Sequence, residues 1–230
     1  MKKNNRRESF ILALILLLVL AAAIFLDAKL PSYHIAIKVI KKACVYSLVA
    51  VSMNLLNGFT GLFSLGQAGF MLLGAYAYAI LSIPVAKRAG VYQYFDGGIV
   101  KFSLPEVFSG IFGEAAGPIV GMLIALLIGG LIAGLVAYLI GLPVLRLRSD
   151  YLAIATLGFA EILRALIQWS ALGPLTNASN LLQNYPELGG ATAYLLLIAV
   201  FIGTILLLVN STYGRAFKAI RDDEIAAEAM

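Results

Sequence analysis

Cysteine and histidine are almost absent from this sequence, which contains one of each, Cys44 and His34. A single cysteine allows no disulfide within the chain. A single histidine argues against a metal site built from several imidazoles and against a Ser-His-Asp catalytic triad. The apolar runs also contain no pair of acidic residues that could share acid–base chemistry. We therefore expect no metal, no cofactor and no catalytic site in this chain.

Charged residues are scarce as well. They make up 13% of the 230 residues, whereas soluble domains carry about a quarter, and 61% of the residues are hydrophobic. This composition predicts a polytopic membrane protein in contact with the lipid bilayer, with no room for a separate soluble domain. The net charge of +5 is spread over the flanks of the apolar runs, so we expect no nucleic-acid partner.

The longest stretch without a charged residue runs from Ala43 to Ala86. A transmembrane helix needs about 20 apolar residues, so a stretch of about twice that length must be interrupted. Its middle, residues 57–69, holds four glycines among polar side chains, which can satisfy the backbone amides that a break releases. Such a glycine-rich interruption is typical of transport sites. The alternatives are a tight turn outside the bilayer or glycines that only permit close helix packing.

Six apolar runs predict an all-α bundle of about six transmembrane helices. The first run could be a cleavable signal peptide, but it continues past the small residues 21–23, which favours a retained helix with a cytoplasmic N-terminus. Lys and Arg are only slightly more numerous on the segments that this topology places inside. The runs cover residues 10–26, 40–56, 68–83, 118–140, 151–169 and 192–209.

Small residues recur at every fourth position of the fourth predicted span. Lipid offers no hydrophobic drive for helix association, so a row of small side chains is the usual means of close backbone contact. The row predicts a helix buried in a bundle. Its members are Gly117, Gly121, Ala125, Gly129, Ala133, Ala137 and Gly141.

Two opposite charges, Glu161 and Arg164, lie three residues apart in the fifth predicted span and therefore on one helix face. Charges inside a span usually face the protein interior and often carry function. Two interpretations stay open. The two residues form a structural ion pair, or Glu161 is the titrating group of an ion-coupled secondary carrier of amino acids.

The C-terminal segment, residues 215–230, favours a helix but is too charged to span a membrane. Tyr213, Phe217 and Ile220 share one face, which makes the segment amphipathic. Such a helix either lies on the membrane or docks into a groove of a partner. The acidic residues 222–224 would be repelled by an anionic membrane surface, so the sequence favours docking.

Three motifs in this order resemble the permease subunits of branched-chain amino acid ABC importers: residues 53–70, 145–162 and 214–229. The Arg-Leu-Arg-x-Asp-Tyr-Leu-Ala element at 146–153 resembles the M-type subunit rather than its H-type partner. Residues 175–180 depart from the Thr-Gly-Gly segment that is usual in the family. The chain also ends within the third motif, whereas family members continue through further membrane helices, so we expect a partial chain.

The resemblance implies an ATP-driven importer of branched-chain or related hydrophobic amino acids in a bacterial-type inner membrane. Residues 1–230 would be a single permease domain, incomplete at its C-terminus, that forms half of the translocation pathway. The implied partners are a second, H-type permease subunit, two cytoplasmic ATPase subunits and an extracytoplasmic substrate-binding protein. Because the ATPases hydrolyse ATP, the chain itself would not be an enzyme.

The resemblance also implies roles for two sets of residues. A pathway for a hydrophobic amino acid needs apolar walls and a few polar groups for the zwitterion. The expected pathway residues are Asn54, Asn57, Gly58, Gly61, Ser64, Gly66, Gln67 and Gly69. The helix within residues 211–230 would be a cytoplasmic coupling helix that sits in a groove of an ATPase. Its expected coupling residues are Gly214, Arg215, Ala219, Ile220, Arg221, Asp222, Asp223 and Glu224.

Overall fold

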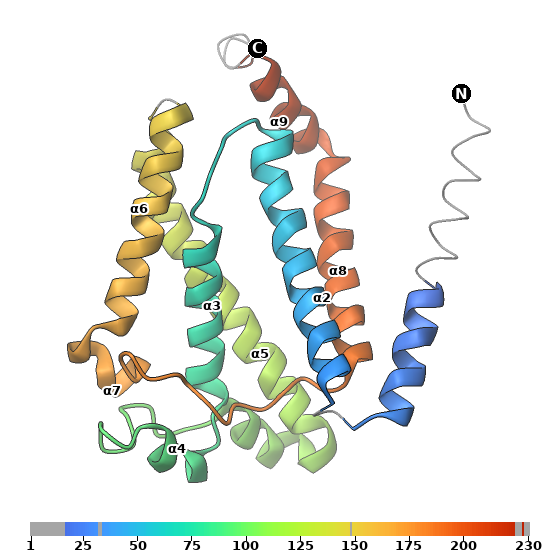
Figure 1. Cartoon of the computed structure of the whole chain (residues 1–230), viewed down its shortest axis with the longest axis vertical. Helices are drawn as coiled ribbons and strands as arrows, with labels where there is room; N and C mark the ends of the chain where they lie inside the picture. The colour runs from blue at the N-terminus through green and yellow to red at the C-terminus, as the bar shows by residue number, and fades with distance from the viewer. Residues whose placement is uncertain (1–16, 32–33, 148, 224–226, 228–230) are drawn as a thin grey trace. The chain divides into compact units, whose positions relative to one another are not determined.

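The computed structural model describes residues 17–31, 34–147, 149–223 and 227 of the chain. Helices form all the regular structure of these residues, which contain no strand, and this confirms the predicted all-α fold (Figure 1). The chain forms two compact units. The first unit comprises residues 1–60 and 188–230, and the second comprises residues 61–187.

The first unit is built around two long helices that pack along each other, α2 (Ile35–Asn54) and α8 (Ala191–Val209) (Figure 1). A helix over residues 17–29 precedes them. The π-helical turn η1 (Leu55–Phe59) continues α2, and α9 (Thr212–Asp222) follows α8. The small buried core of this unit contains Ala23, Ile37 and Ala191, with Leu30, Ile40 and Leu195 packed against it.

Asp27 fixes the start of α8. Its Oδ1 accepts a hydrogen bond from the backbone N–H of Ala191 at 2.9 Å, and its Oδ2 accepts from the N–H of Thr192 at 2.8 Å. The Thr192 hydroxyl also donates to Oδ2 at 2.6 Å. The first N–H groups of a helix have no partner within the helix, and a carboxylate at that end is further stabilised by the helix dipole. Asp27 therefore acts as a cap supplied by a distant segment.

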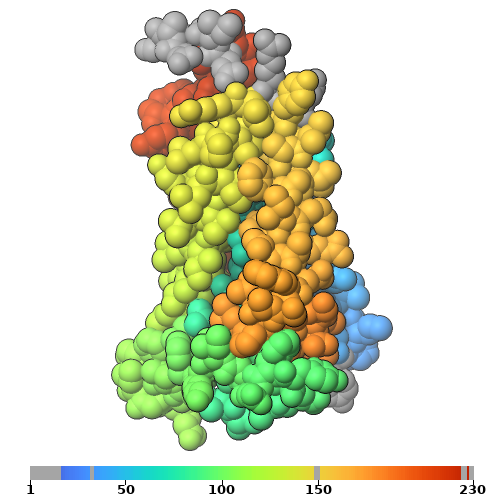
Figure 2. Space-filling view, turned by 90° about the vertical axis from the view of Figure 1, so that its left-hand side faces the viewer, coloured from blue at the N-terminus to red at the C-terminus, as the bar shows by residue number. Residues whose placement is uncertain are grey.

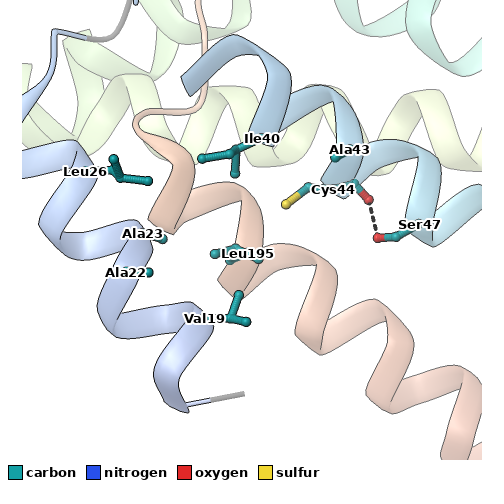
Figure 3. Close-up of a pocket in the computed structure, with 9 residues that line it drawn as sticks. All are labelled: Val19, Ala22, Ala23, Leu26, Ile40, Ala43, Cys44, Ser47 and Leu195. Atoms are coloured by element: carbon teal, nitrogen blue, oxygen red, sulfur yellow. Dashed lines mark hydrogen bonds between the residues drawn. The ribbon is translucent and has the colours of Figure 1, made fainter. Parts of the chain in front are cut away.

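The same unit contains an apolar cavity of about 410 Å³ between the helix of residues 17–29, α2 and α8 (Figure 3). The buried Cys44 lines it, and the Ser47 hydroxyl beside it donates to the Cys44 carbonyl at 2.7 Å. The only cysteine is thus enclosed by aliphatic side chains. The cavity is lined by Val19, Ala22, Ala23, Leu26, Ile40, Ala43, Cys44, Ser47 and Leu195.

The second unit contains three longer helices, α3 (Gln67–Ser82), α5 (Leu104–Val144) and α6 (Ser149–Gln168). Helix α3 packs against both of the others, and α5 and α6 lie side by side on the face shown in Figure 2. The short helices of the unit are α4 (Val85–Val91), η2 (Ser170–Leu172) and α7 (Gly173–Thr176).

Helix α5 bends sharply at Gly113, whose φ of 81° and ψ of 169° are not helical. Residues 104–112 fold back on the helix, so a Cβ at Gly117 would lie 2.3 Å from Ser109 Cα and one at Gly121 would lie 2.6 Å from the Leu104 carbonyl oxygen. The first glycines of the four-residue row thus face their own helix rather than a neighbour. Further along, Gly129 approaches the Gly74 carbonyl of α3.

The opposite face of α5 is not covered by other described residues of this chain. In the described part of the chain, Leu127, Leu131 and Leu135 are exposed, whereas Ala125 in the row of small residues is fully buried. The row therefore packs α5 on one side only and leaves an apolar surface on the other.

The polar segment after α3 is folded around Arg88, which is only 3% exposed. Its Nη2 donates to the carbonyl oxygens of Ile80 at 2.7 Å and Phe102 at 2.6 Å. Burial lowers the pKa of Arg88, while the neighbouring Tyr92 and Glu106 raise it by a smaller amount. The cation at the C-terminus of α3 satisfies a helix-end carbonyl and complements the helix dipole.

Three described helices are long and apolar enough to cross a membrane: α5, residues 151–168 of α6, and α8. Helix α3 is apolar but has only 16 residues. These helices support a multi-pass membrane protein, and the total of six spans remains a prediction. Residues 10–16 of the first predicted span, and the N-terminal basic residues before it, lie outside the described part of the chain.

Candidate functional site

The glycine-rich segment breaks the helix, as predicted. Helix α2 passes into the π-helical turn η1, residues 60–66 are not helical, and α3 begins at Gln67. Gly61 has a φ of 72°, a conformation that glycine adopts without strain. The boundary between the two units falls inside this break. The predicted pathway residues are therefore divided: Asn54, Asn57 and Gly58 belong to the first unit, and Gly61, Ser64, Gly66, Gln67 and Gly69 to the second.

On the side of the first unit, the break consists of η1 and the residues that close it. Asn54 and Gly58 are exposed and Asn57 is half-buried. A Cβ at Gly58 would lie 2.2 Å from Asn54 Oδ1, so any larger residue would displace that side chain. The Thr60 hydroxyl donates to the Leu56 carbonyl, which satisfies one of the carbonyls at the helix end.

On the side of the second unit, α6 holds the start of α3. The backbone N–H of Leu65 donates to Thr156 Oγ1 at 3.0 Å, and this hydroxyl donates to the Ala153 carbonyl at 3.0 Å. Ser64 is buried, and the N–H of Gly66 donates to its hydroxyl at 3.4 Å. Thr156 thus supplies a polar group to the nonhelical backbone, although the sequence analysis did not single it out.

Close packing explains two of the predicted pathway glycines. A Cβ at Gly69 would lie 2.9 Å from Ala160 Cα in α6, and one at Gly66 would lie 3.4 Å from the Thr156 carbonyl oxygen. Both residues are buried, so they serve helix packing. Gln67 is half-buried and lies at the first position of α3.

The predicted coupling helix forms as α9, and Gly214 sets its position. This glycine is buried, and a Cβ on it would lie 1.9 Å from the Val209 carbonyl oxygen at the end of α8. Phe217 and Ile220 are half-buried, but Tyr213, which the sequence assigned to the same apolar face, is 67% exposed. The predicted coupling residues that are exposed are Arg215, Ala219, Arg221, Asp222 and Asp223. Glu224 lies outside the described residues.

Two basic residues of α9 contact η1. Lys218 Nζ lies 5.7 Å from the centroid of the Phe59 ring, within the range of a cation–π interaction. Arg221 Nη1 donates to the Gly58 carbonyl at 3.5 Å, and its guanidinium also pairs with Asp222 at 3.1 Å. The predicted coupling helix α9 therefore contacts η1 within the first unit.

Glu161 and Arg164 form an ion pair on α6, with Arg164 Nη1 3.4 Å from Glu161 Oε2. Their side chains are 65% and 59% exposed in the structure. The pair therefore lies on an open face of its helix. Among the described residues, no group of three or more His, Cys, Asp or Glu could hold a metal ion.

Comparison with known proteins identifies the chain's relatives. A family described as "Branched-chain amino acid transport system / permease component" matches residues 35–230. Two curated relatives, from Escherichia coli strain K12 and Salmonella typhimurium strain LT2, are each named high-affinity branched-chain amino acid transport system permease protein LivM. Each is 28% identical over 220 residues, which cover 81% of this chain and 44% of the relative. No solved structure matches the chain.

The chain thus spans less than half the length of these curated relatives, whose names describe transport permeases rather than enzymes. The family match includes all three motifs from which the resemblance was argued. Because it covers most of the sequence, this chain belongs to the family of branched-chain amino acid transport system permease components.

Proposed function

We propose that this chain is part of the permease subunit of an ATP-driven importer for branched-chain or related hydrophobic amino acids. The family match over residues 35–230 carries this proposal. A helix break between two apolar helices and an amphipathic helix after α8 fit the two tasks of such a subunit, which are to line a pathway and to receive movement from a motor.

The proposed partners follow from the transport-system relatives and from the surfaces of α9. Two ATPase subunits would lie on the cytoplasmic side and contact exposed residues of α9, which include Tyr213, Arg215 and Ala219. A second permease subunit of the H type would complete the pathway, and a substrate-binding protein would deliver the amino acid from outside. In this arrangement residues 1–230 belong to one permease domain of the inner membrane, with a cytoplasmic N-terminus.

Within the pathway, we assign different roles to the predicted residues. Asn54, Asn57 and Gln67 are exposed or half-buried and carry amides that can bind an ammonium or a carboxylate group. The buried Gly66 and Gly69 pack α3 against α6. The zwitterion of the substrate would therefore meet amide groups, while its aliphatic side chain would meet apolar walls.

Transport in proteoliposomes tests the proposal. The protein at its natural length, assembled with its permease partner and ATPases, should take up radiolabelled leucine, isoleucine or valine only when ATP is enclosed and the binding protein is present. A proton or sodium gradient without ATP should drive no uptake. Gradient-driven uptake without ATP would instead establish the secondary carrier, with Glu161 as the titrating group.

A further inference from the structure

The contact between α9 and η1 joins the predicted coupling helix directly to the helix break. Lys218 and Arg221 lie one turn apart on α9 and meet consecutive residues of η1, Phe59 and Gly58. In each contact, a cationic side chain of α9 meets an aromatic ring or a carbonyl oxygen of η1. Lys218 and Arg221 therefore link α9 to η1, although the two elements are far apart in the sequence.

The partial negative charge at the end of η1 explains why basic side chains of α9 are favoured beside it. The last carbonyls of a helix lack partners within it and carry a partial negative charge. Arg221 donates a hydrogen bond to one of these carbonyls, that of Gly58, and Lys218 lies over the ring of the next residue, Phe59. A cation–π contact adds stabilisation even at an exposed position. The two contacts thus involve the last two residues of η1, the turn that continues α2.

The other end of α9 is fixed. Gly214 is packed against the Val209 carbonyl, and the N–H of Ser211 donates to the Leu208 carbonyl at 3.1 Å. Helix α8 in turn packs along α2. The start of α9 is therefore held by α8, and the second half of α9 contacts η1 through Lys218 and Arg221.

We propose that Lys218 and Arg221 are positioning residues that transmit the movement of α9 to the break at the end of α2. They act inward, on Phe59 and Gly58, and the ATPase is bound by the other side of α9. This inference rests on the proposed function, because it takes α9 as the helix that an ATPase moves. It changes the expected role of Arg221, which the sequence assigned to the ATPase interface.

Substitutions on both sides of the contact test the proposal. Lys218→Ala and Phe59→Leu each remove the cation–π pair. The first substitution changes α9, whereas the second changes η1 and leaves α9 intact. In proteoliposomes of the complete complex, each variant should lower the amount of leucine imported per ATP hydrolysed several-fold. The double variant should be no worse than either single variant, since both remove the same interaction. Co-purification of the ATPases should be unchanged.

A matched control exists in the same unit. Lys42 Nζ lies 5.8 Å from the centroid of the Tyr46 ring, a similar contact that joins two residues within α2. Lys42→Ala and Tyr46→Leu should leave the ratio of import to ATP hydrolysis at the wild-type value. Equal losses in these variants and in the Lys218 and Phe59 variants would overturn the proposal, because any cation–π pair would then have the same effect.

Two further outcomes separate the inference from the proposed function. If Lys218→Ala releases the ATPases while Phe59→Leu changes nothing, Lys218 binds the ATPase and the inference fails, although the importer assignment stands. If the wild-type complex shows no ATP-driven uptake, the proposed function fails first. Should the variants not assemble, cross-linking of a Phe59→Cys, Lys218→Cys pair with a bifunctional maleimide, in a Cys44→Ser background, tests the contact itself. Absence of the cross-link would overturn the inference.

Discussion

Single residues determine where α8 begins and where the chain turns after it. Asp27 caps the start of the helix from a position 164 residues earlier than Ala191, and Gly214 allows α9 to turn against its end. The sequence analysis named Gly214 through its motif but did not identify Asp27. An isolated aspartate after an apolar run has no local pattern, because its hydrogen-bond donors lie at the opposite end of the sequence.

Replacing the Asp27 carboxylate should destabilise the first unit. In Asp27→Asn, one of the two acceptor oxygens becomes an amide nitrogen, which faces a backbone donor of α8 without bonding to it. We expect a loss of about 1 kcal/mol, the usual effect of removing a helix cap, measured by thermal unfolding in detergent. Asp96→Asn is the control, since Asp96 is exposed with a positive φ that asparagine tolerates. Equal losses in both would contradict the capping role.

The same carboxylate predicts a pH dependence. Burial raises the pKa of Asp27, but hydrogen bonds from Thr192 and Ala191 and the charge of Lys41 lower it more, so the pKa lies below the ordinary 3.8. A lowered pKa in the folded state means that this stabilisation is complete above pH 3.8 and is lost as the pH falls through the folded-state pKa. The difference in unfolding temperature between wild type and Asp27→Asn should therefore persist from pH 7 to pH 5 and shrink only in stronger acid.

Gly214 should tolerate no side chain. In Gly214→Ala the new methyl group would meet the backbone of Val209, which cannot move without disturbing the end of α8. We expect ATP-driven uptake to fall at least tenfold, measured at equal amounts of protein in the membrane. Gly203→Ala in α8 is the control, because a Cβ there meets nothing within 4 Å and alanine favours the helix. Normal uptake by Gly214→Ala would contradict the close packing of α9.

Whole elements show which patterns can be interpreted from sequence alone. The break between α2 and α3 was predicted because no single span could hold the uncharged stretch, and glycines mark its position. The four-residue row in α5 predicted close packing but not its partners. Its first members contact the segment that folds back at Gly113, and such a fold-back depends on contacts that periodicity does not encode.

The packing of α5 against α3 should depend on which of two adjacent glycines is replaced. A Cβ at Gly129 would lie 2.9 Å from the Gly74 carbonyl oxygen, whereas one at Gly130 would meet nothing within 4 Å. Gly129→Ala should therefore destabilise the second unit by about 1–3 kcal/mol through overpacking, and Gly130→Ala should be neutral or slightly stabilising. Thermal unfolding in detergent compares them. Equal destabilisation by both substitutions would refute this helix contact.

At the scale of the whole molecule, composition and motifs predicted the membrane class, the family and the order of the helices. They did not predict the polar interior of the segment after α3. Arg88 is buried there and donates to the carbonyl oxygens of Ile80 and Phe102. In the sequence, an arginine among aromatic residues looks the same whether its side chain is exposed to water or buried against backbone carbonyls. Only the tertiary structure distinguishes these two cases.

Assembly with the ATPases should depend on an exposed aromatic residue in the first turn of α9. Tyr213 is 67% exposed and has an aromatic ring of the kind that anchors protein interfaces. Tyr213→Ala should reduce the amount of ATPase that co-purifies with the complex several-fold, without changing the amount of permease in the membrane. Tyr94→Ala is the matched control, because Tyr94 is an exposed tyrosine of the second unit. An undiminished ATPase yield with Tyr213→Ala would place the interface elsewhere.

The π-helical turn at the end of α2 has a consequence for how a pathway could change shape. Such a turn accommodates one residue more than an α-helical turn, and this surplus is held at Leu55–Phe59. If these residues adopted regular α geometry, the residue that follows them would turn about the helix axis by about 100° and shift along it by about 1.5 Å. A change between π-helical and α-helical geometry at this helix end would therefore turn the side chains there in one discrete step, without unfolding the helix.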